Sequence, residues 1–468
     1  MKKIILLIFI LLISMVCFVG CYYTPSEVIS VVSIVKTGSD GLKDTYTITY
    51  SNGTISFLEI ENGKDGKDAD SINIDDLYNK YLELYPDITY EEFINKILDK
   101  DVDTNSFAIH KALRSSAKIY AEFTESYRVG PMSSGKETAL SLGSSVIYKV
   151  EEDYTYFLTN YHIVYNKNAL EENKIAKKLV CYLYGSEGGP VSTNTKDESG
   201  CAVYDYGKYA IECEYVGGII TADIAIVKAP TESVKAINPY VVQIEFADRY
   251  YVGQTAIAIG NPEGEGISVT QGIVSIDNEY INLAFDSVTR SYRSIRIDTS
   301  IYNGSSGGGL YNEDGELIGI TNAGDGDDQN VNFAVPLEIV RNAAENIMYY
   351  ASINEPYSKK ITVGIEVESI NSKYIYDSEL GRGEIWETII IRNIVENSIA
   401  EKLGLLVDDE IIAITVNDNT YTIKRNFNIS DVLLTIRKGD IVSFIVNRDD
   451  KEIKTNSYII VENDLNQI

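Results

Sequence analysis

The stretch "YNGSSGGGLYNEDGELIGI", residues 302–320, indicates both the fold and the chemistry to expect from this chain. Glycines surround two adjacent serines, and an apolar pattern typical of a β-strand follows at once. Glycine permits backbone conformations and close approaches that let amide N–H groups converge on a developing negative oxygen. In the order Gly-x-Ser-Gly-Gly the middle serine is Ser306. We therefore predict that Ser306 is a nucleophile and that the N–H groups of Gly304 and Ser306 form an oxyanion hole.

A serine hydroxyl needs a neighbouring base at neutral pH, and histidine is suited to this because its pKa is about 6.5. The chain has two histidines, and His162 in "FLTNYHIV" directly follows a strand pattern. Asp223 in "ITADIAIVKA" stands at the start of another strand, where a carboxylate could fix the imidazole tautomer. His110 lies near the end of a helical pattern and is interpreted as structural or solvated. The predicted triad is His162, Asp223 and Ser306, with the serine in a second barrel.

Short β-strands separated by turn residues dominate residues 114–352. The expected strands are "SSVIYKV", "YTYFLTN", "LVCYLYG", "ADIAIVKA", "QTAIAIGNP", "SVTQGIVSI", "RSIRIDTS", "GELIGITNA" and "NVNFAVP", closed by an amphipathic helix in "LEIVRNAAENIMYYA". Many short strands with few helices favour barrels or sandwiches. A second β-rich unit follows over residues 353–468, with helices expected at Ser398–Leu403 and about Ile429–Arg437. The predicted fold is mainly β, a double barrel followed by an α+β domain.

Residues 115–350 resemble the chymotrypsin-like fold and, within it, the HtrA/DegP family of bacterial envelope serine proteases. "YFLTNYHIV" and "TADIAIVKA" are similar to the His and Asp motifs of that family, and "AIAIGNPEGEGISVTQGIVSI" is similar to its inter-barrel signature. "IDTSIYNGSSGGGLYNEDGELIGITNA" and "VNFAVPLEIV" resemble its Ser motif and its closing strand and helix. The resemblance implies a serine endopeptidase that cleaves unfolded or misfolded exported proteins through an acyl-enzyme. Because members of this family are often trimers or larger cages, the resemblance also leads us to expect a homotrimer. No cofactor is predicted.

The chain departs from the family pattern at several places around these motifs. Ser305 stands where the family has Asn or Asp, Gly309 where it has Ala or Pro, and Tyr161 where a smaller or amide side chain is common. The interval between His162 and Asp223 carries a long insertion that we expect to hold all three mature cysteines. Every catalytic residue type is nevertheless present.

The substrate pocket is predicted to include Ser300, which lies six positions before Ser306. Because Ser300 is not an acid, the pocket offers no evident anion to Lys or Arg. The family resemblance implies small or medium aliphatic residues at the cleaved position. The acidic loop "GDGDDQN" is interpreted as a solvated turn and not a calcium site, since its spacing matches no EF-hand. No metal site is predicted.

The C-terminal unit resembles a PDZ domain in "IVENSIAEKLGLLVDDEIIAI" and "DIVSFIVNRDDKEI". Such domains add an extended peptide as a strand and capture its C-terminal carboxylate with backbone N–H groups. "ITVGIEV" stands where the carboxylate loop is expected, so the predicted groove contains Val363, Gly364 and Ile365. Because Gly364 alone supplies the loop glycine, a purely structural or regulatory domain is the alternative.

The N-terminus "MKKIILLIFILLISMVCFVGCYYTPS" has the charged, apolar and small-residue segments of an export signal over residues 1–20. "FVGC" resembles the lipobox of bacterial lipoproteins, which implies acylation of Cys21 and an extracytoplasmic protein anchored by lipid to the bacterial cell membrane. Phe18 departs from the usual Leu, and an ordinary or uncleaved signal is the alternative. Residues 21–70 are expected to form a β-hairpin turning at Asn52-Gly53 and a flexible "GKDGKDA" linker. Residues 71–113 are expected to be a small helical segment.

Charge and cysteine content limit the remaining possibilities. The formal net charge of −28 argues against a nucleic-acid partner, because phosphate binding needs clustered Lys and Arg. An exported compartment permits a disulfide, but Cys181, Cys201 and Cys213 allow three different single pairs, and no CxxC spacing suggests zinc.

Three functions remain open at the level of the sequence. The first is a membrane-anchored endopeptidase that uses the triad. The second is a non-cleaving, chaperone-like scaffold that holds exported polypeptides in a protease-like cleft and at the C-terminal groove. The third is a processing protease for one surface substrate. The hydroxyl of Ser306 separates the first from the second.

Overall fold

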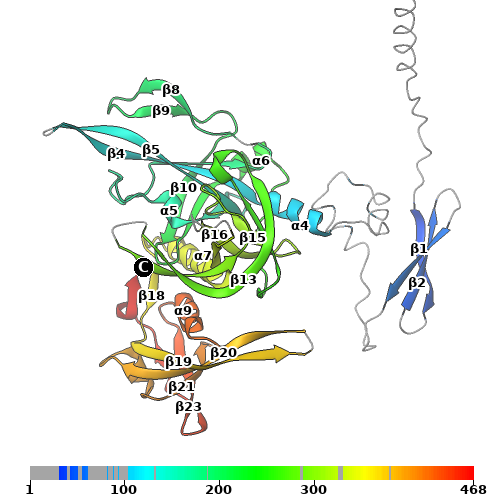
Figure 1. The fold of residues 1–468 in the computed structure, drawn as a ribbon, viewed down its shortest axis with the longest axis vertical. Helices are drawn as coiled ribbons and strands as arrows, with labels where there is room; N and C mark the ends of the chain where they lie inside the picture. Colours follow the sequence, from blue (N-terminus) through cyan, green and yellow to red (C-terminus); the bar gives the residue numbers. More distant parts are fainter. Residues whose placement is uncertain are drawn as a thin grey trace, which may run out of the picture. The chain divides into compact units, whose positions relative to one another are not determined.

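The computed structural model describes residues 31–39, 43–50, 55–61, 78, 82, 88, 93, 104–130, 133–186, 188–284, 288–324, 330–378 and 381–468 (Figure 1). The chain divides into two compact units, residues 1–102 and 103–468. The predicted signal segment, the acylation site at Cys21 and the "GKDGKDA" linker lie outside the described residues. Within the part of the chain that is described, no helix is long and apolar enough to cross a membrane.

The first unit contains a three-stranded antiparallel sheet in the order β1-β2-β3. Its strands are β1 (Val31–Ser39), β2 (Lys43–Tyr50) and β3 (Ile55–Glu61). Strands β2 and β3 form the hairpin that the alternating pattern predicts, with Thr49 opposite Ile55. Of the predicted helical segment, residues 78, 82 and 93 are helical, and α4 (Thr104–Leu113) opens the second unit.

Two closed six-stranded barrels form the body of the second unit. The first has the strand order β10-β11-β6-β5-β4-β7 and the second β12-β13-β14-β17-β16-β15, which confirms the predicted double-barrel fold. The first barrel consists of β4 (Ser116–Gly130), β5 (Ser133–Val150), β6 (Tyr154–Thr159), β7 (Lys178–Leu183), β10 (Ile211–Ile219) and β11 (Ile224–Pro230). The second consists of β12 (Thr255–Gly260), β13 (Ser268–Leu283), β14 (Arg290–Ile297), β15 (Gly309–Tyr311), β16 (Leu317–Gly324) and β17 (Asn332–Pro336).

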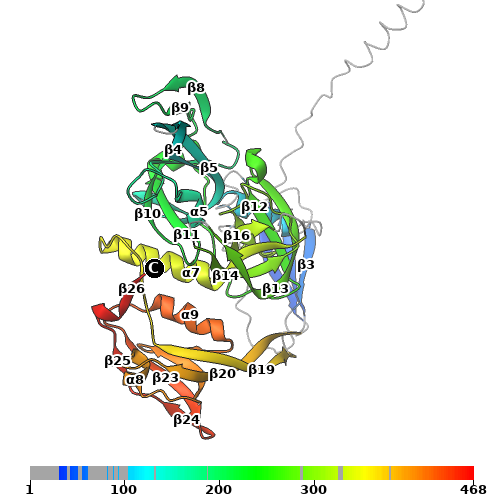
Figure 2. The same cartoon turned by 60° about the vertical axis from the view of Figure 1, so that its left-hand side comes forward.

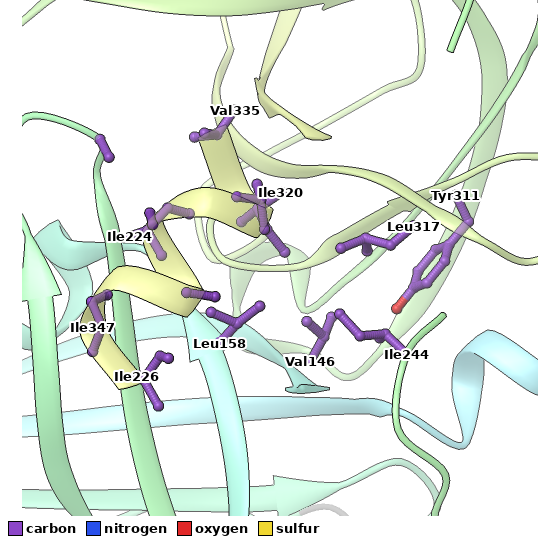
Figure 3. Close-up of a cluster of buried hydrophobic side chains, with 14 of the residues drawn as sticks. Val146, Leu158, Ile224, Ile226, Ile244, Tyr311, Leu317, Ile320, Val335 and Ile347 are labelled. Atoms are coloured by element: carbon purple, nitrogen blue, oxygen red, sulfur yellow. The ribbon is translucent and has the colours of Figure 1, made fainter. Parts of the chain in front are cut away.

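A shared apolar core joins the two barrels to the helix α7 (Leu337–Ser352) (Figure 3). Side chains from all three parts are at most 1% exposed in this core: Leu158 and Ile226 from the first barrel, Leu317 and Ile320 from the second, and Ile347 from α7. Burying each such side chain contributes about 1.5–3 kcal/mol, so this core opposes separation of the barrels. The barrels therefore present a fixed junction on which side chains from both can meet.

The first barrel carries a long hairpin that the sequence patterns missed. Strands β4 and β5 pair from Ser116↔Val146 out to Gly130↔Ser133, well beyond the barrel wall (Figure 1). A separate two-stranded sheet, β8 (Val191–Lys196) and β9 (Ala202–Asp205), lies against this hairpin, where Thr138 Oγ1 donates to the Ala202 carbonyl at 2.8 Å. The short helix α6 (Thr231–Ile237) follows the first barrel.

The three described cysteines are free thiols. Cys181 and Cys213 lie on the neighbouring barrel strands β7 and β10, so the expectation that the insertion between His162 and Asp223 holds all three cysteines is wrong for these two. A hydrogen bond with Cys181, together with burial, raises the pKa of the Cys213 thiol. Cys201 stands apart, just before β9.

The C-terminal part combines a strongly bent sheet with two helices (Figure 2). The sheet contains β19 (Ile365–Asp377), β20 (Arg382–Ile394), β21 (Glu410–Val416), β22 (Asn419–Thr422), β23 (Ile441–Arg448), β24 (Lys451–Lys454) and β25 (Tyr458–Ile459), and β18 (Lys359–Ile361) pairs separately with β26 (Leu465–Gln467). Helix α8 (Ile399–Leu403) has Ser398 as its N-cap and ends at Gly404, whose φ is 78°.

Helix α9 (Asn426–Thr435) begins earlier than the predicted Ile429–Arg437 and also ends earlier. The Asn428 side chain accepts hydrogen bonds from the backbone N–H groups of Lys424 and Arg425, which caps the helix start before Ile429. Helix α9 packs beside α7, where Asn346 Nδ2 donates to the Leu434 carbonyl at 2.9 Å. This contact connects the C-terminal part to the barrels.

Candidate active site

His162 lies on a one-turn helix at the end of a barrel strand. Strand β6 leads into α5 (Tyr161–Val164), and the buried Ile163 and Val164 anchor this turn in the first barrel. The His162 side chain is 20% exposed. The preceding Asn160 is fully buried, and its Nδ2 donates to the Asp223 carbonyl at 2.9 Å. The apolar strand pattern therefore places His162 at the barrel surface, next to the loop that carries Asp223.

Asp223 lies just before β11 and is fully buried. Its Oδ1 accepts the backbone N–H of His162 at 3.0 Å, and its Oδ2 lies 2.8 Å from His162 Nδ1. The φ of Asp223 is 52°, a left-handed conformation that Asp tolerates better than most residues. The carboxylate favours a proton on Nδ1 and so assigns the basic lone pair of the imidazole to Nε2.

The glycines around Ser306 are required by close backbone contacts. Gly304 and Gly307 have φ values of 92° and 87°. A Cβ on Gly304 would stand 2.3 Å from the Asn261 carbonyl oxygen, and one on Gly307 would stand 2.2 Å from the Ser144 carbonyl oxygen. Both the conformation and the packing therefore exclude larger side chains. The serine loop therefore packs directly against the first barrel at Ser144 and against the second barrel at Asn261.

Ser306 lies beside the segment that carries His162. A Cβ on Gly143 would stand 2.8 Å from the Ile163 side chain and 3.0 Å from the Ser306 carbonyl oxygen, so Gly143 has α5 on one side and the serine on the other. The Ser306 hydroxyl donates to the Asn322 carbonyl at 2.8 Å. The hydroxyl proton of Ser306 is therefore directed at Asn322 in this structure.

The two predicted oxyanion donors lie on the 303–304 and 305–306 peptides of the serine loop, with one peptide between them. Among the described residues, neither the Gly304 nor the Ser306 N–H has a hydrogen-bond acceptor. The Asn303 carbonyl accepts the Glu263 N–H at 2.6 Å. Because the C=O and N–H of a trans peptide point in opposite directions, the Gly304 N–H is turned away from Glu263. The loop thus presents two unpaired donors, as an oxyanion hole requires.

A small neutral cavity of ≈ 150 Å³ adjoins this loop. Its lining is Ala258, Ile259, Gly260, Pro262, Ser268, Thr270, Ser300, Tyr302, Ser305 and Thr321. The predicted pocket residue Ser300 is among them, and no charged side chain is. Such a cavity suits an uncharged side chain of modest size.

The other predicted ligand sites have different outcomes. Most of the acidic "GDGDDQN" loop lies outside the described residues, and the described part of the chain contains no cluster of His, Cys, Asp and Glu that could hold a metal. In the C-terminal part, a groove of ≈ 280 Å³ runs between β18, β19 and α9. Val363, Gly364 and Ile365 all line it, opposite Ile429 and Leu433. The φ of Gly364 is 85°.

Two groups at the active site were missed by sequence reasoning. One is the backbone carbonyl of Asn322, which accepts the Ser306 hydroxyl and has no signature in the sequence. The other is Ser144 in "LGSSVI", a fully buried residue of β5 that contacts the serine loop through several hydrogen bonds. A serine inside a strand pattern gives no functional signal by itself.

Known proteins resemble this chain over the barrels. Residues 143–320 match the family model described as "Trypsin-like peptidase domain". "Serine protease Do-like HtrA" of Bacillus subtilis is 26% identical over 334 residues, which cover 68% of this chain and 64% of that protein. "Putative serine protease HhoB" of Synechocystis is 33% identical over 212 residues, covering 44% of this chain and 48% of that protein. The chain thus spans less than two thirds of the length of either curated relative.

One solved structure is also similar over a large share of the chain. The "HtrA-type protease AlgWS227A with decapeptide" is 21% identical, with a TM-score of 0.47, and the match covers 76% of this chain and 97% of that one.

Proposed function

We propose that this chain is a trypsin-like serine endopeptidase of the HtrA type, with His162, Asp223 and Ser306 as its triad; the match of residues 143–320 to the trypsin-like peptidase model and the similarity to HtrA-type proteases support this proposal. The observation that carries the proposal is the paired contact of one buried carboxylate with both the ring Nδ1 and the backbone N–H of His162. This pairing prepares Nε2 as a base beside a serine loop with two unpaired amide donors.

The chemistry follows from these positions. The Ser306 hydroxyl turns from the Asn322 carbonyl, transfers its proton to His162 Nε2, and its oxygen bonds to the substrate carbonyl carbon. The Gly304 and Ser306 N–H groups receive the resulting oxyanion. His162 then returns the proton to the amine as the C–N bond breaks, which leaves an acyl-enzyme on Ser306. Water repeats the sequence: His162 accepts a proton from water, the water oxygen bonds to the acyl carbon, and His162 returns the proton to Ser306 as the acyl–oxygen bond breaks and the free acid leaves.

The substrates we propose are unfolded or misfolded exported proteins. The neutral cavity around Ser300 favours uncharged side chains of modest size, which are abundant in the buried segments that unfolding exposes. We further propose that the groove at Val363, Gly364 and Ile365 binds peptide C-termini as in a PDZ domain. Two observations support this proposal. Gly364 has a left-handed backbone conformation and lies in the groove beside the apolar face of α9, and Lys360 also lines the groove, where its charge would attract a carboxylate.

Location and assembly are proposed from the sequence. The export signal and the lipobox-like "FVGC" support an extracytoplasmic protein held to the bacterial membrane by acylated Cys21. A homotrimer follows from family resemblance. Labelling with a radioactive fatty acid, compared between the wild type and Cys21→Ser, tests the anchor, and analytical ultracentrifugation tests the trimer.

A non-cleaving scaffold is the second candidate, and one observation favours it. The Ser306 hydroxyl donates its proton to the Asn322 carbonyl in this structure. A loop locked in this arrangement would hold polypeptides without cutting them. The neighbouring Ser305 provides a matched control, because its hydroxyl makes one long contact, with the Tyr302 N–H at 3.4 Å.

The deciding experiment compares cleavage of unfolded casein by the wild type, Ser306→Ala and Ser305→Ala. We expect the wild type and Ser305→Ala to cleave and Ser306→Ala to lose activity. A fluorophosphonate probe should add its mass to Ser306 in the two active proteins. Absence of both cleavage and adduct in the wild type would instead support the scaffold.

A further inference from the structure

Ser144 makes four hydrogen bonds at the serine loop, and three of them connect the first barrel to the second. Its Oγ donates to the Gly304 carbonyl and accepts the Asn261 N–H, each at 2.8 Å. Its backbone N–H donates to the Ser306 carbonyl, and its carbonyl accepts Thr159 Oγ1, again each at 2.8 Å. Ser144 belongs to β5 of the first barrel and is 1% exposed, so water cannot replace these contacts.

The contacts of Ser144 complete a continuous series along the serine loop. The carbonyls of residues 303, 304, 305 and 306 accept, in order, from the Glu263 N–H, Ser144 Oγ, Thr321 Oγ1 and the Ser144 N–H. Each peptide is planar, so fixing its carbonyl also fixes the N–H on its other side. Ser144 supplies the two of these donors that come from the first barrel. It holds the 304–305 peptide, which lies between the peptides that carry the Gly304 and Ser306 N–H groups, and the 306–307 peptide, which follows them.

The same residue links the serine loop to the strand that leads to His162. Thr159 ends β6, three residues before His162, and its hydroxyl donates to the Ser144 carbonyl. A Cβ on Gly307 would stand 2.2 Å from that carbonyl, so the loop and the strand meet at Ser144 without a gap. A shift of either barrel at this point would move Ser306 relative to His162.

We propose that Ser144 is a positioning residue of the proposed protease. It holds the peptide that lies between the Gly304 and Ser306 N–H groups, which sets the spacing of the two donors, and it fixes their loop against the barrel of His162 and Asp223. Its hydroxyl joins the Gly304 carbonyl to the Asn261 N–H, and Asn261 begins the turn whose Glu263 holds the Asn303 carbonyl. Ser144 touches neither substrate nor reacting atoms in this role. It acts through the loop, and the role rests on the proposed function.

The matched control is Ser145, its neighbour on β5, which is buried to the same 1%. The Ser145 hydroxyl faces the interior of the first barrel, with the Ala117 carbonyl at 3.5 Å and Cys181 Sγ at 3.9 Å. Ser144→Ala and Ser145→Ala therefore delete the same atom from the same strand. A general loss of packing should lower the activity of both variants alike. A loss of loop alignment should lower the activity of Ser144→Ala alone.

The test measures kcat and KM with a chromogenic peptide, and inhibition by the corresponding peptide aldehyde. Attack of Ser306 on the aldehyde gives a tetrahedral adduct whose oxygen needs the same two N–H groups. We expect Ser144→Ala to lower kcat about 10–100-fold with KM within about threefold, since misplaced transition-state donors cost rate more than binding. Its aldehyde inhibition constant should rise by a similar factor, and Ser145→Ala should retain both values.

Different failures have different readings. A wild type that cleaves nothing and forms no aldehyde adduct overturns the proposed function and this role with it. A cleaving wild type whose kcat and aldehyde affinity survive in Ser144→Ala overturns the role alone. Should Ser144→Ala fail to fold, Ser144→Cys retains a side chain of similar shape but replaces the hydroxyl by a weak donor. The same loss is then expected, and an unchanged kcat in Ser144→Cys would overturn the role.

Discussion

His162 Nδ1 lies 2.8 Å from Asp223 Oδ2, while the His162 backbone N–H donates to the other oxygen of the same carboxylate. One buried side chain thus fixes both the position of the α5 turn and the orientation of the ring that it carries. Because the carboxylate is fully buried, water does not weaken either contact. The proposed catalytic base is therefore held in place before any substrate arrives.

Replacement of Asp223 by Asn tests this arrangement. Asn tolerates the left-handed φ of 52° and retains one acceptor, so the fold should survive. Its amide group would face His162 Nδ1 as a donor and favour the tautomer with the proton on Nε2, which cannot act as a base. We expect kcat to fall by about 10⁴-fold with a native circular dichroism spectrum. A fall of less than about tenfold would show that Asp223 does not orient the base.

Replacement of Gly307 by Ala tests the packing of the serine loop. A Cβ there would stand 2.2 Å from the Ser144 carbonyl oxygen and 2.4 Å from Thr159 Oγ1, at a φ of 87°. We expect a loss of about 3 kcal/mol or more in the free energy of unfolding, measured with urea, because steric overlap adds to the backbone strain. Gly207→Ala is the control, since its φ is 70° and nothing lies within 4 Å of the new Cβ. It should cost about 1–2 kcal/mol, and equal losses in the two variants would contradict the packing argument.

Replacement of Ser300 by Asp tests the substrate pocket. The cavity lining contains no charged side chain, so no other negative charge would repel a new carboxylate there. The carboxylate could then pair with a basic side chain of the substrate. We expect kcat/KM for peptides with Lys or Arg at the cleaved position to rise about 10–100-fold, since hydrogen bonds to charged groups contribute about 1.5–3 kcal/mol. Ser300→Asn is the neutral control. A peptide-library profile that is the same for Ser300→Asp and Ser300→Asn would show that residue 300 does not contact the cleaved side chain.

The sequence was sufficient to predict the double barrel and the three residues proposed as the triad, because each of those residues carries a distinctive side chain at a strand end. Ser144 could not be predicted, since "GSS" within a strand pattern does not tell which serine faces the other barrel. The acceptor of the Ser306 hydroxyl is a backbone carbonyl, which any residue would supply. The β4–β5 hairpin was also missed, because its outer part is largely exposed and lacks a continuous apolar side.

The contact between α9 and the second barrel contains a buried ion pair. Arg293 Nη2 lies 2.9 Å from Asp431 Oδ1 and 3.6 Å from Glu338 Oε2, so one guanidinium faces two carboxyl groups. Burial raises the pKa of Asp431 to about 6, although the charge of Arg293 acts to lower it. The ordinary pKa of an Asp carboxyl is about 3.9. We therefore expect that between about pH 4 and 6 the folded protein holds a proton on Asp431 that the unfolded chain has released.

This difference predicts how stability changes with pH. A carboxyl whose pKa is raised by folding stabilises the protein below its unfolded pKa, and this contribution is lost as the pH rises through the folded value. We expect the free energy of unfolding of the wild type to fall by about 1–3 kcal/mol relative to Asp431→Asn between pH 4 and pH 7. Urea titrations of both proteins at each pH measure this difference, and other carboxyl groups cancel in the comparison. A constant difference between the two proteins across that range would show that Asp431 is ionised in the folded state throughout, and that its pairing with Arg293 outweighs its burial.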